Sequence, residues 1–285
     1  MPDTDHLHWG ADALWQQLEP ALPGLSVEVV ARVASTNSLL LERARNSGRA
    51  AEPLGRRQAD TQPCLLVAEH QLQGRGRQGK AWQSSLGASL TFSLVLTLAR
   101  ADWSGLSLAI GLALADALDP PNEGAAPRVM LKWPNDLIVA DAPGVGRKLG
   151  GILIESAPMG TQRVAVIGIG LNVLPQPVDD AALGYASLQE LRYGLTAPQA
   201  LALVAPALVA GIKAFEAQGL APSLAGYALR DWLAGRAVTT TLAEAPAGIA
   251  EGIDGDGALL LRVGADVRRV ACGEVSVRLD ESGRC

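Results

Sequence analysis

The chain has few of the side chains that most often carry metal or nucleophilic chemistry. Its 285 residues include three cysteines, without a metal-type spacing, and three histidines, two of them within the first eight residues. The sequence contains no H-E-x-x-H, G-x-S-x-G or Walker A motif. These absences argue against a zinc site, a Ser-His-Asp hydrolase and a P-loop nucleotide site.

Charge and apolar runs limit the partners that we expect. The net charge is −5 and 19% of the residues are charged, so a broad basic face for nucleic acid is not expected. The first 25 residues begin acidic and resemble no signal peptide, and no uninterrupted apolar run reaches membrane-spanning length. The few, odd-numbered cysteines suit a reducing compartment. The sequence therefore predicts a cytoplasmic protein without a membrane segment.

Lysine is also scarce, with 4 lysines against 20 arginines. Lys80, Lys132 and Lys148 lie in segments rich in glycine or turn residues, whereas Lys213 lies in a plain helical run. A lysine kept in an arginine-rich chain indicates that a compact, mobile ammonium group is wanted at that place. These three lysines are therefore candidate site residues.

The hydrophobic pattern predicts an α+β fold, with a mixed β-sheet flanked by helices and then a small β-barrel. The expected strands of the first part are 27–34, 64–69, 89–98, 128–132, 137–140, 148–155 and 163–168. The expected helices run from Ser35-Thr36-Asn37 to Gly48 and over 104–118, 197–217 and 221–233. Five short β-like runs follow Gly235, at 237–242, 248–254, 258–263, 266–271 and 274–279. We therefore predict domains at 1–234 and 235–285, and residues 46–63 as a loop without an assigned role.

The segment Gly74–Trp82 reads G-R-G-R-Q-G-K-A-W and is the most informative of the chain. Its glycines match G-x-G-x-x-G, but the segment leads into a strand instead of opening a helix, so a Rossmann site is rejected. A solvated surface loop is the plain alternative. The cations between the glycines favour a loop that wraps a small anionic ligand.

Two further segments place charged groups at strand ends. Lys132-Trp133-Pro134-Asn135-Asp136 has the form of a hairpin turn, but a lysine and a carboxylate at one strand end could handle a phosphate and its magnesium. Arg147–Glu155 begins with two cations, and its two glycines allow the close approach of a ligand or mark a bulge. The predicted strand that includes Gly168–Asn172 ends in small residues and an amide.

Together these segments supply cations and amides but no covalent nucleophile. Such a set suits attack of a substrate carboxylate on the α-phosphate of ATP. Two like unit charges about 4 Å apart repel by about 4 kcal/mol at an effective dielectric constant of about 20. Arg75, Arg77, Lys80, Lys148 and a magnesium ion could offset this repulsion and orient the reacting groups.

In order and spacing, the chain closely resembles the biotin–protein ligases over about residues 25–280. The matching segments are Ser35-Thr36-Asn37, Gly74–Trp82, Lys132–Asp136, Arg147–Glu155 and Gly168–Asn172. The run Gly255–Arg278 resembles the SH3-like barrel that ends the bacterial members. The resemblance implies a class II synthetase-like catalytic domain and a two-step reaction. Biotin and MgATP give biotinyl-5′-AMP, and the biotinyl group then moves to a lysine of a biotin carboxyl carrier domain.

The resemblance also implies roles for single residues. The expected biotin-binding residues are Ser35, Thr36, Asn37, Gln71, Gly74, Arg75, Arg77, Lys148 and Gly151. The expected nucleotide-binding residues are Arg77, Lys80, Trp82, Lys132, Asn135, Asn172 and Tyr185. The expected catalytic residues are Lys148, Arg77 and Asp136, and Asp136 is also the candidate magnesium ligand or acceptor-lysine contact. The glycine-rich loop is expected to close over the adenylate, so that Gly76→Ser would release it.

Some positions depart from the family pattern. Tyr185 stands where a tryptophan covers adenine in well-known members, and Lys80 stands where arginine is common. Only about 25 residues precede the first expected core strand, too few for the winged helix-turn-helix of the regulatory relatives, so we expect no DNA binding.

Three alternatives stay open at this point: a lipoate ligase or octanoyltransferase of the same superfold, a non-catalytic biotin-binding regulator, and an inactive paralogue. The loop with its following tryptophan argues against the first alternative, and the filled catalytic positions argue against the other two. A homodimer through an exposed sheet edge at Gly151–Ser156 is a further expectation.

Overall fold

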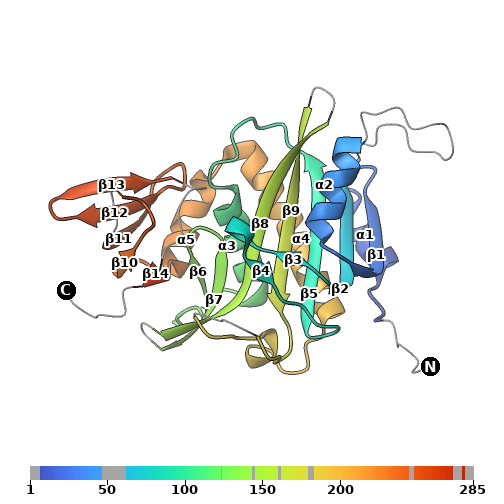
Figure 1. Cartoon of the computed structure of the whole chain (residues 1–285), viewed down its shortest axis with the longest axis horizontal. Coiled ribbons are helices and arrows are strands. Elements are labelled where there is room, and N and C mark those ends of the chain that lie inside the picture. Colours follow the sequence, from blue (N-terminus) through green and yellow to red (C-terminus); the bar gives the residue numbers. More distant parts are fainter. Residues whose placement is uncertain are drawn as a thin grey trace. The chain divides into compact units, whose positions relative to one another are not determined.

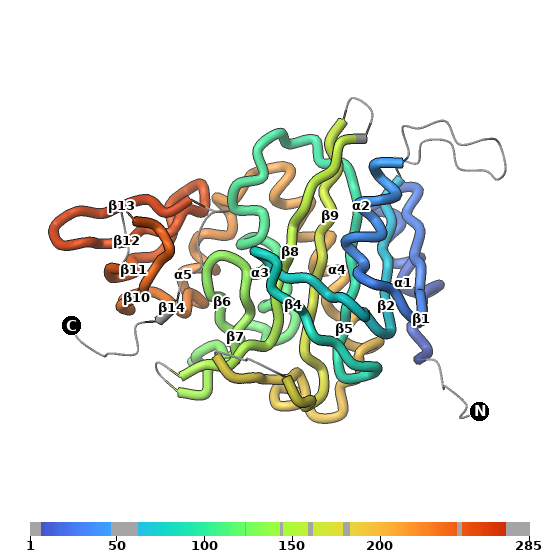
Figure 2. The backbone as a smooth tube through the Cα atoms, viewed as in Figure 1, coloured from blue at the N-terminus to red at the C-terminus, as the bar shows by residue number. Residues whose placement is uncertain are grey.

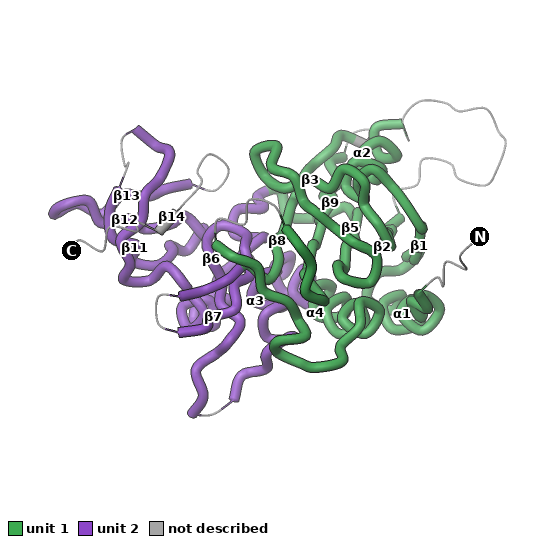
Figure 3. The backbone as a smooth tube through the Cα atoms, turned by 60° about the horizontal axis from the view of Figure 1, so that its bottom comes forward, with its two compact units in different colours: residues 1–101, 148–209 green, residues 102–147, 210–285 purple. Residues whose placement is uncertain are grey.

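The computed structural model describes residues 7–46, 62–122, 124–142, 145–159, 162–178, 183–243, 247–271 and 278–279. The chain separates into two compact units, residues 1–101 with 148–209 and residues 102–147 with 210–285, coloured green and purple in Figure 3. Most of the expected loop 46–63 and most of the expected last strand lie outside the described residues. The expected domain boundary between residues 234 and 235 stays a prediction.

A seven-stranded sheet has the order β1-β2-β5-β9-β8-β7-β6 (Figure 1). The strands in this order are β1 (Ser26–Val33), β2 (Cys64–Gln71), β5 (Ser89–Thr97), β9 (Gln162–Asn172), β8 (Val145–Met159), β7 (Asp136–Ala142) and β6 (Val129–Lys132). β1 and β2 are parallel, whereas β2 with β5, β5 with β9, β9 with β8 and β6 with β7 are antiparallel. The sheet is therefore mixed, as the sequence predicts.

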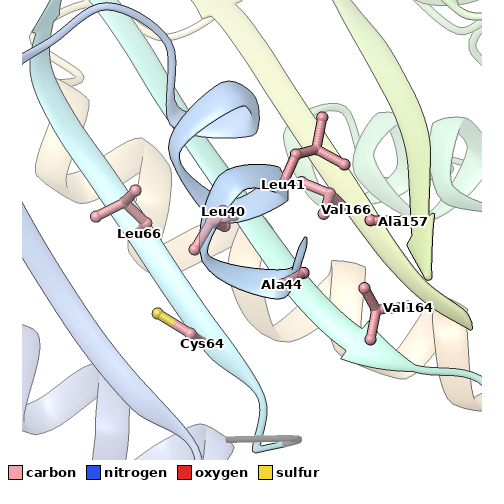
Figure 4. Close-up of a cluster of buried hydrophobic side chains, with 8 residues drawn as sticks. All are labelled: Leu40, Leu41, Ala44, Cys64, Leu66, Ala157, Val164 and Val166. Carbon is pink, nitrogen blue, oxygen red and sulfur yellow. The ribbon is translucent and has the colours of Figure 1, made fainter. Parts of the chain in front are cut away.

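Helix α2 (Thr36–Asn46) packs on the sheet of the first unit, over β2, β5 and β9 (Figure 2). Leu40, Leu41 and Ala44 lie on one face of α2 and enter an apolar cluster with buried side chains of β2, β8 and β9 (Figure 4). The cluster consists of Leu40, Leu41, Ala44, Cys64, Leu66, Ala157, Val164 and Val166. This packing holds the second and third turns of α2 against the sheet, over the first residues of β2.

Cys64 is a buried member of this cluster, and we expect its thiol to be inert in the folded protein. Desolvation by burial, with the nearby charge of Glu28, raises the pKa of the Cys64 thiol to about 11. At pH 8 only about one thiol in a thousand is then ionised. Alkylation of Cys64 by iodoacetamide, followed by peptide mapping, should be at least about a hundredfold slower than in urea. Equal rates in the two states would contradict this.

Helix α1 (Ala11–Leu18) is an element that the sequence did not predict. It is short, and only Leu14 and Leu18 are buried within it. The residues before it are held by Glu69 of β2, whose Oε1 accepts the Leu7 N–H at 2.9 Å and the Trp9 Nε1–H at 3.3 Å. The contacts that order this segment are thus distant in sequence. This explains why the local sequence pattern did not predict the helix.

The second unit contains helix α3 (Leu106–Leu118), β6, β7, helix α5 (Leu224–Arg230) and a small sheet. The small sheet has the antiparallel order β13-β12-β11-β10-β14. Its strands are β10 (Ala237–Thr239), β11 (Ala247–Ile253), β12 (Leu259–Val263), β13 (Asp266–Val270) and β14 (Arg278–Leu279). The fold class is confirmed. The expected helix 221–233 is shorter than predicted, because Asp231 is extended and bridges to Leu131.

Helix α4 (Ala197–Gln218) is long and apolar enough to cross a membrane by length and composition. Gln199 and Lys213 interrupt the apolar sequence of α4, so the expectation that no uninterrupted apolar run reaches membrane-spanning length is not contradicted. Its buried residues include Leu201, Val204, Leu208 and Ile212, which recur every three or four residues along one stripe. That stripe is the pattern of a core helix, which passes the same composition test.

Candidate functional site

The start of α2 forms a polar cluster with the end of β2. The Ser35 hydroxyl accepts the Ser38 backbone N–H at 3.4 Å, which caps the helix. Thr36 donates its backbone N–H and its hydroxyl to Gln71 Oε1, at 2.7 and 3.0 Å. Ser35, Thr36 and Gln71 are all buried. The structure thus brings together three of the residues predicted to bind biotin.

Asn37 extends this polar group toward β5 and β8. The Ser93 hydroxyl lies 2.6 Å from both Thr36 Oγ1 and Asn37 Oδ1. The Asn37 amide donates to the Leu153 carbonyl at 3.2 Å and to Glu155 Oε2 at 2.9 Å. Both amide hydrogens and the amide oxygen of Asn37 are therefore used within the protein. This arrangement favours a supporting role, and direct contact of Asn37 with biotin stays a prediction.

The glycine-rich segment is a small hairpin of β3 (Gly74–Arg75) and β4 (Ala81–Trp82). Its tip is closed by hydrogen bonds from the Gly76 N–H to the Lys80 carbonyl at 2.7 Å and from the Lys80 N–H to the Arg77 carbonyl at 3.1 Å. A hairpin replaces the helix that a Rossmann site requires, so the rejection of that site is confirmed. The hairpin carries Arg75, Arg77 and Lys80 together.

Trp82 packs the far strand of the hairpin onto the sheet. A Cβ atom on Gly170 of β9 would lie 2.6 Å from Trp82 Cε2, so only glycine lets the indole lie this close. Gly170 is paired in register with Gly151 of β8. The Trp82 Nε1–H is buried without a hydrogen-bond partner among the described residues. Trp82 and Gly151 are therefore close to one stretch of β8 and β9.

Lys148 lies on β8 beside the segment that contains Tyr185. The Lys148 N–H donates to the Gly184 carbonyl at 3.2 Å, and the Lys148 carbonyl accepts the Ala186 N–H at 2.9 Å. Asn172 also donates its side-chain amide to the Lys148 carbonyl, at 3.0 Å. These contacts fix the backbone from which the Lys148 ammonium extends.

Tyr185 is held by its hydroxyl, which donates to the Leu174 carbonyl at 2.6 Å. Desolvation by burial raises the pKa of Tyr185 to about 12, so the ring stays neutral at physiological pH. Asn172 also donates to the Ala186 carbonyl at 3.0 Å. The two residues thus support the Lys148 segment, and their contact with a nucleotide stays a prediction.

Lys132, Asn135 and Asp136 belong to the second unit. Lys132 and Asp136 are paired in register, with Lys132 Nζ 3.9 Å from Asp136 Oδ2. Trp133 between them is fully buried and donates its Nε1–H to the Gly257 carbonyl at 3.0 Å, which makes it a packing residue. The Trp133–Pro134 peptide bond is cis. This hairpin turn therefore presents one ammonium and one carboxylate.

Arg147, one of the two cations that begin β8, is bound within the second unit. Its Nε and Nη2 donate to the two carboxylate oxygens of Asp141, both at 2.7 Å. Hydrogen bonding by the Arg147 guanidinium holds the pKa of the Asp141 carboxyl below its usual range. Arg147 thus forms a bidentate surface ion pair.

Two polar residues of the site were missed from the sequence. Ser93 lies in a strand with alternating serine and threonine, where nothing marks it apart from its neighbours. Glu155 ends the Arg147–Glu155 segment and was not assigned a role, although its carboxylate contacts Arg75 and Asn37. The signal in the sequence that could have indicated Glu155 was a carboxylate at the end of an apolar strand.

Comparison with known proteins identifies the family of the chain. Residues 50–172 match the Biotin/lipoate A/B protein ligase family, and residues 234–278 match the Biotin protein ligase C terminal domain. The chain is 35% identical over 276 residues to the Biotin–[acetyl-CoA-carboxylase] ligase of Mycobacterium tuberculosis, covering 93% of this chain and 91% of that protein. It is 34% identical over 272 residues to the Bifunctional ligase/repressor BirA of Escherichia coli, covering 93% of this chain and 78% of that protein.

The fold is also similar to that of solved biotin protein ligases. The solved structure of the biotin protein ligase from Aquifex aeolicus in complex with biotin and ATP superposes with a TM-score of 0.69 at 23% identity, covering 89% of this chain and 99% of that chain. This likeness shows the fold, and the family match over residues 50–172 gives the class, a ligase of the biotin and lipoate type. The family matches and the full-length relatives go further: the chain belongs to the biotin protein ligases.

Proposed function

We propose that the chain activates biotin with ATP to biotinyl-5′-AMP and transfers the biotinyl group to a lysine of a biotin carboxyl carrier domain. The observation that carries this proposal is the position of the Gly74–Trp82 hairpin. Arg75 is bound to Glu155 of β8, and Trp82 packs on Gly170 of β9. The cationic hairpin is thereby held on β8, the strand that contains Lys148.

In the first step, a carboxylate oxygen of biotin attacks the α-phosphate of ATP. A phosphorus–oxygen bond forms as the bond to pyrophosphate breaks. We assign Lys148 to the reacting carboxylate and α-phosphate, and Arg77 and Lys80 to the phosphate charge. We assign Ser35, Thr36 and Gln71 to the ureido ring of biotin, because their side chains supply buried donors and acceptors of hydrogen bonds in one place.

In the second step, the neutral amine of the acceptor lysine attacks the acyl carbon of the mixed anhydride and AMP leaves. Hydrolysis competes with this transfer, so the adenylate must be shielded from water. The Gly74–Trp82 hairpin is the element that we assign to this shielding. Asp136 is our candidate for contact with the acceptor lysine or with magnesium.

The described residues offer no group of three or more His, Cys, Asp or Glu side chains for a metal. A single carboxylate such as Asp136 suits magnesium that arrives on the phosphates of ATP, because such an ion keeps most of its ligands from phosphate and water. Bound there, magnesium would reduce the negative charge of the phosphates.

ATP–pyrophosphate exchange tests the first step, with biotin, lipoate or octanoate added separately to the purified protein. Exchange with biotin alone is the expected result. Exchange with lipoate or octanoate instead would contradict the assignment of biotin as the substrate. No exchange with any of them would contradict the proposed activity. Streptavidin blotting of a purified carrier domain, beside a variant without its acceptor lysine, tests the second step.

We propose Gly74, in place of Gly76, as the critical glycine of the hairpin. A Cβ atom on Gly74 would lie 2.3 Å from the Trp82 carbonyl oxygen, whereas on Gly76 the nearest atom is 3.4 Å away. Gly76→Ser therefore has no steric reason to open the hairpin. We expect Gly74→Ala to lower biotin-dependent exchange about tenfold or more, because overpacking costs about 1–3 kcal/mol. The matched variant Gly76→Ala should stay within about twofold of wild type, and equal activity of both variants would contradict the assignment.

A further inference from the structure

Glu155 joins two parts of the site that lie far apart in the sequence. Its Oε1 accepts Arg75 Nη2 of the hairpin at 2.5 Å, and its Oε2 accepts the Asn37 amide of α2 at 2.9 Å. Arg75 also donates Nη1 to the Ser38 hydroxyl at 3.3 Å. The guanidinium of Arg75, predicted to bind biotin, is therefore engaged with α2 and β8.

The contacts of Glu155 continue into the polar cluster at the start of α2. The Ser93 hydroxyl lies within hydrogen-bond distance of both Asn37 and Thr36. The Thr36 hydroxyl in turn donates to Gln71. This row of hydrogen-bonded side chains joins the hairpin to α2, β5, β8 and β2. It consists of Arg75, Glu155, Asn37, Ser93, Thr36 and Gln71.

The two strands of the hairpin are held differently. β4 is packed by the Trp82 indole against Gly170, in a contact without charge. β3 is held by the charged pair of Arg75 and Glu155, whose side chains are 49% and 23% exposed. A partly shielded pair of this kind is weaker than a buried one and can open and close. The Glu155 contact thus suits the shielding role that we assign to the hairpin.

We propose that Glu155 is a positioning residue of the ligase reaction, which holds the Gly74–Trp82 hairpin and the start of α2 in one arrangement around bound biotin. This inference rests on the proposed function. Glu155 acts through Arg75 and Asn37. Removal of its charge should therefore loosen the hairpin, weaken biotin binding and release adenylate, while the chemical step stays intact.

Trypsin cleavage without any ligand tests the contact itself. The hairpin contains tryptic sites after Arg77 and Lys80, and mass spectrometry identifies cleavage there. We expect Glu155→Gln to be cleaved at these sites about threefold to tenfold faster than wild type, as for loss of a partly shielded ion pair. The same rate as wild type would overturn the proposal.

The chain offers a matched control for this variant. Glu28 pairs with Arg43 at 2.9 Å, with side chains 24% and 42% exposed, in the same unit but outside the hairpin. Glu28→Gln should leave cleavage after Arg77 unchanged. If both variants accelerate cleavage equally, a general loss of stability explains the effect and the proposal fails.

Steady-state kinetics test the role in the reaction. Glu155→Gln should raise the KM for biotin and the fraction of adenylate released, each about threefold to tenfold, with kcat for exchange within about twofold of wild type. Loss of folded protein would lower kcat and leave KM unchanged, and that result would overturn the proposal.

A double-mutant cycle with Arg75→Gln tests the pair. If both residues act through one contact, the double variant should be no worse than Arg75→Gln alone, whereas additive effects would contradict the pairing. Wild-type protein without biotin-dependent exchange would refute the proposed function. The trypsin comparison needs no substrate, so it decides the contact separately.

Discussion

Replacement of Lys148 by alanine is expected to lower biotin-dependent ATP–pyrophosphate exchange by about a thousandfold. The biotin carboxylate and the α-phosphate are both anionic and must come into contact. Their repulsion is about 4 kcal/mol at about 4 Å and an effective dielectric constant of about 20. Each 1.36 kcal/mol of barrier changes a rate about tenfold, so loss of the cation that offsets most of this repulsion gives the expected factor.

The fold should survive this substitution. Lys148 is held through its backbone by Gly184, Ala186 and Asn172, and alanine keeps all of these hydrogen bonds. Its side chain is half-buried and extends from a strand, where truncation leaves no large core cavity. The expected loss is therefore in the reaction and not in folding.

Exchange measurements with a matched lysine variant separate these effects. Lys213 is about half exposed and pairs with Glu216 at 3.3 Å in α4, so Lys213→Ala removes a lysine without a role in the proposed site. We expect Lys213→Ala to keep wild-type exchange, and Lys148→Arg to recover part of the rate by restoring charge without the compact ammonium. Full exchange by Lys148→Ala would remove Lys148 from the mechanism.

The pattern of the sequence predicted the strands and the start of α2 because each depends on a few neighbouring residues. The alternation of apolar and polar residues in 89–98 and the capping residues at 35–37 act over a few positions, and β5 (Ser89–Thr97) and α2 (Thr36–Asn46) follow them. The grouping of Ser35, Thr36 and Gln71 came from the family resemblance, since residues from two elements meet there only in the folded chain.

Contacts between distant segments could not be predicted in this way. Glu155 contacts Arg75 across a separation of 80 residues, and Trp133 donates to Gly257 across 124. Trp133 therefore looked like part of a site loop, although it is a buried packing residue. The choice between Gly74 and Gly76 likewise depends on the distance to Trp82, which the G-x-G-x-x-G pattern does not contain.

Arg230 also contacts residues that are distant in sequence, and we expect its loss to destabilise the second unit strongly. Arg230 is 3% exposed in α5. Its Nε donates to Asp116 at 2.9 Å, and its Nη1 donates to the Asp119 carboxylate at 3.0 Å and to the Val129 carbonyl at 2.8 Å. Its Nη2 donates to the Asp119 carbonyl at 2.5 Å. One guanidinium thus joins α5 to the end of α3 and to β6.

We expect Arg230→Met to lower the free energy of unfolding by about 3–5 kcal/mol, the usual cost of breaking a buried ion pair from one side. Methionine keeps the apolar stem, so the loss measures the charge and its hydrogen bonds. Asp116 is 41% exposed, and Asp116→Asn should cost only about 1 kcal/mol because water screens that pair.

Urea denaturation followed by tryptophan fluorescence measures these differences, with Arg163→Met as the control. Arg163 is exposed and donates to the Ala101 carbonyl at 3.0 Å, so its loss should cost no more than about 1 kcal/mol. Arg230 is buried and its acceptors include two backbone carbonyls that would lose a donor, which is why the two arginines should differ by several-fold in cost. Equal costs for the two variants would mean that water replaces the guanidinium in the interior of the unit, and that apolar packing alone holds α5 in place.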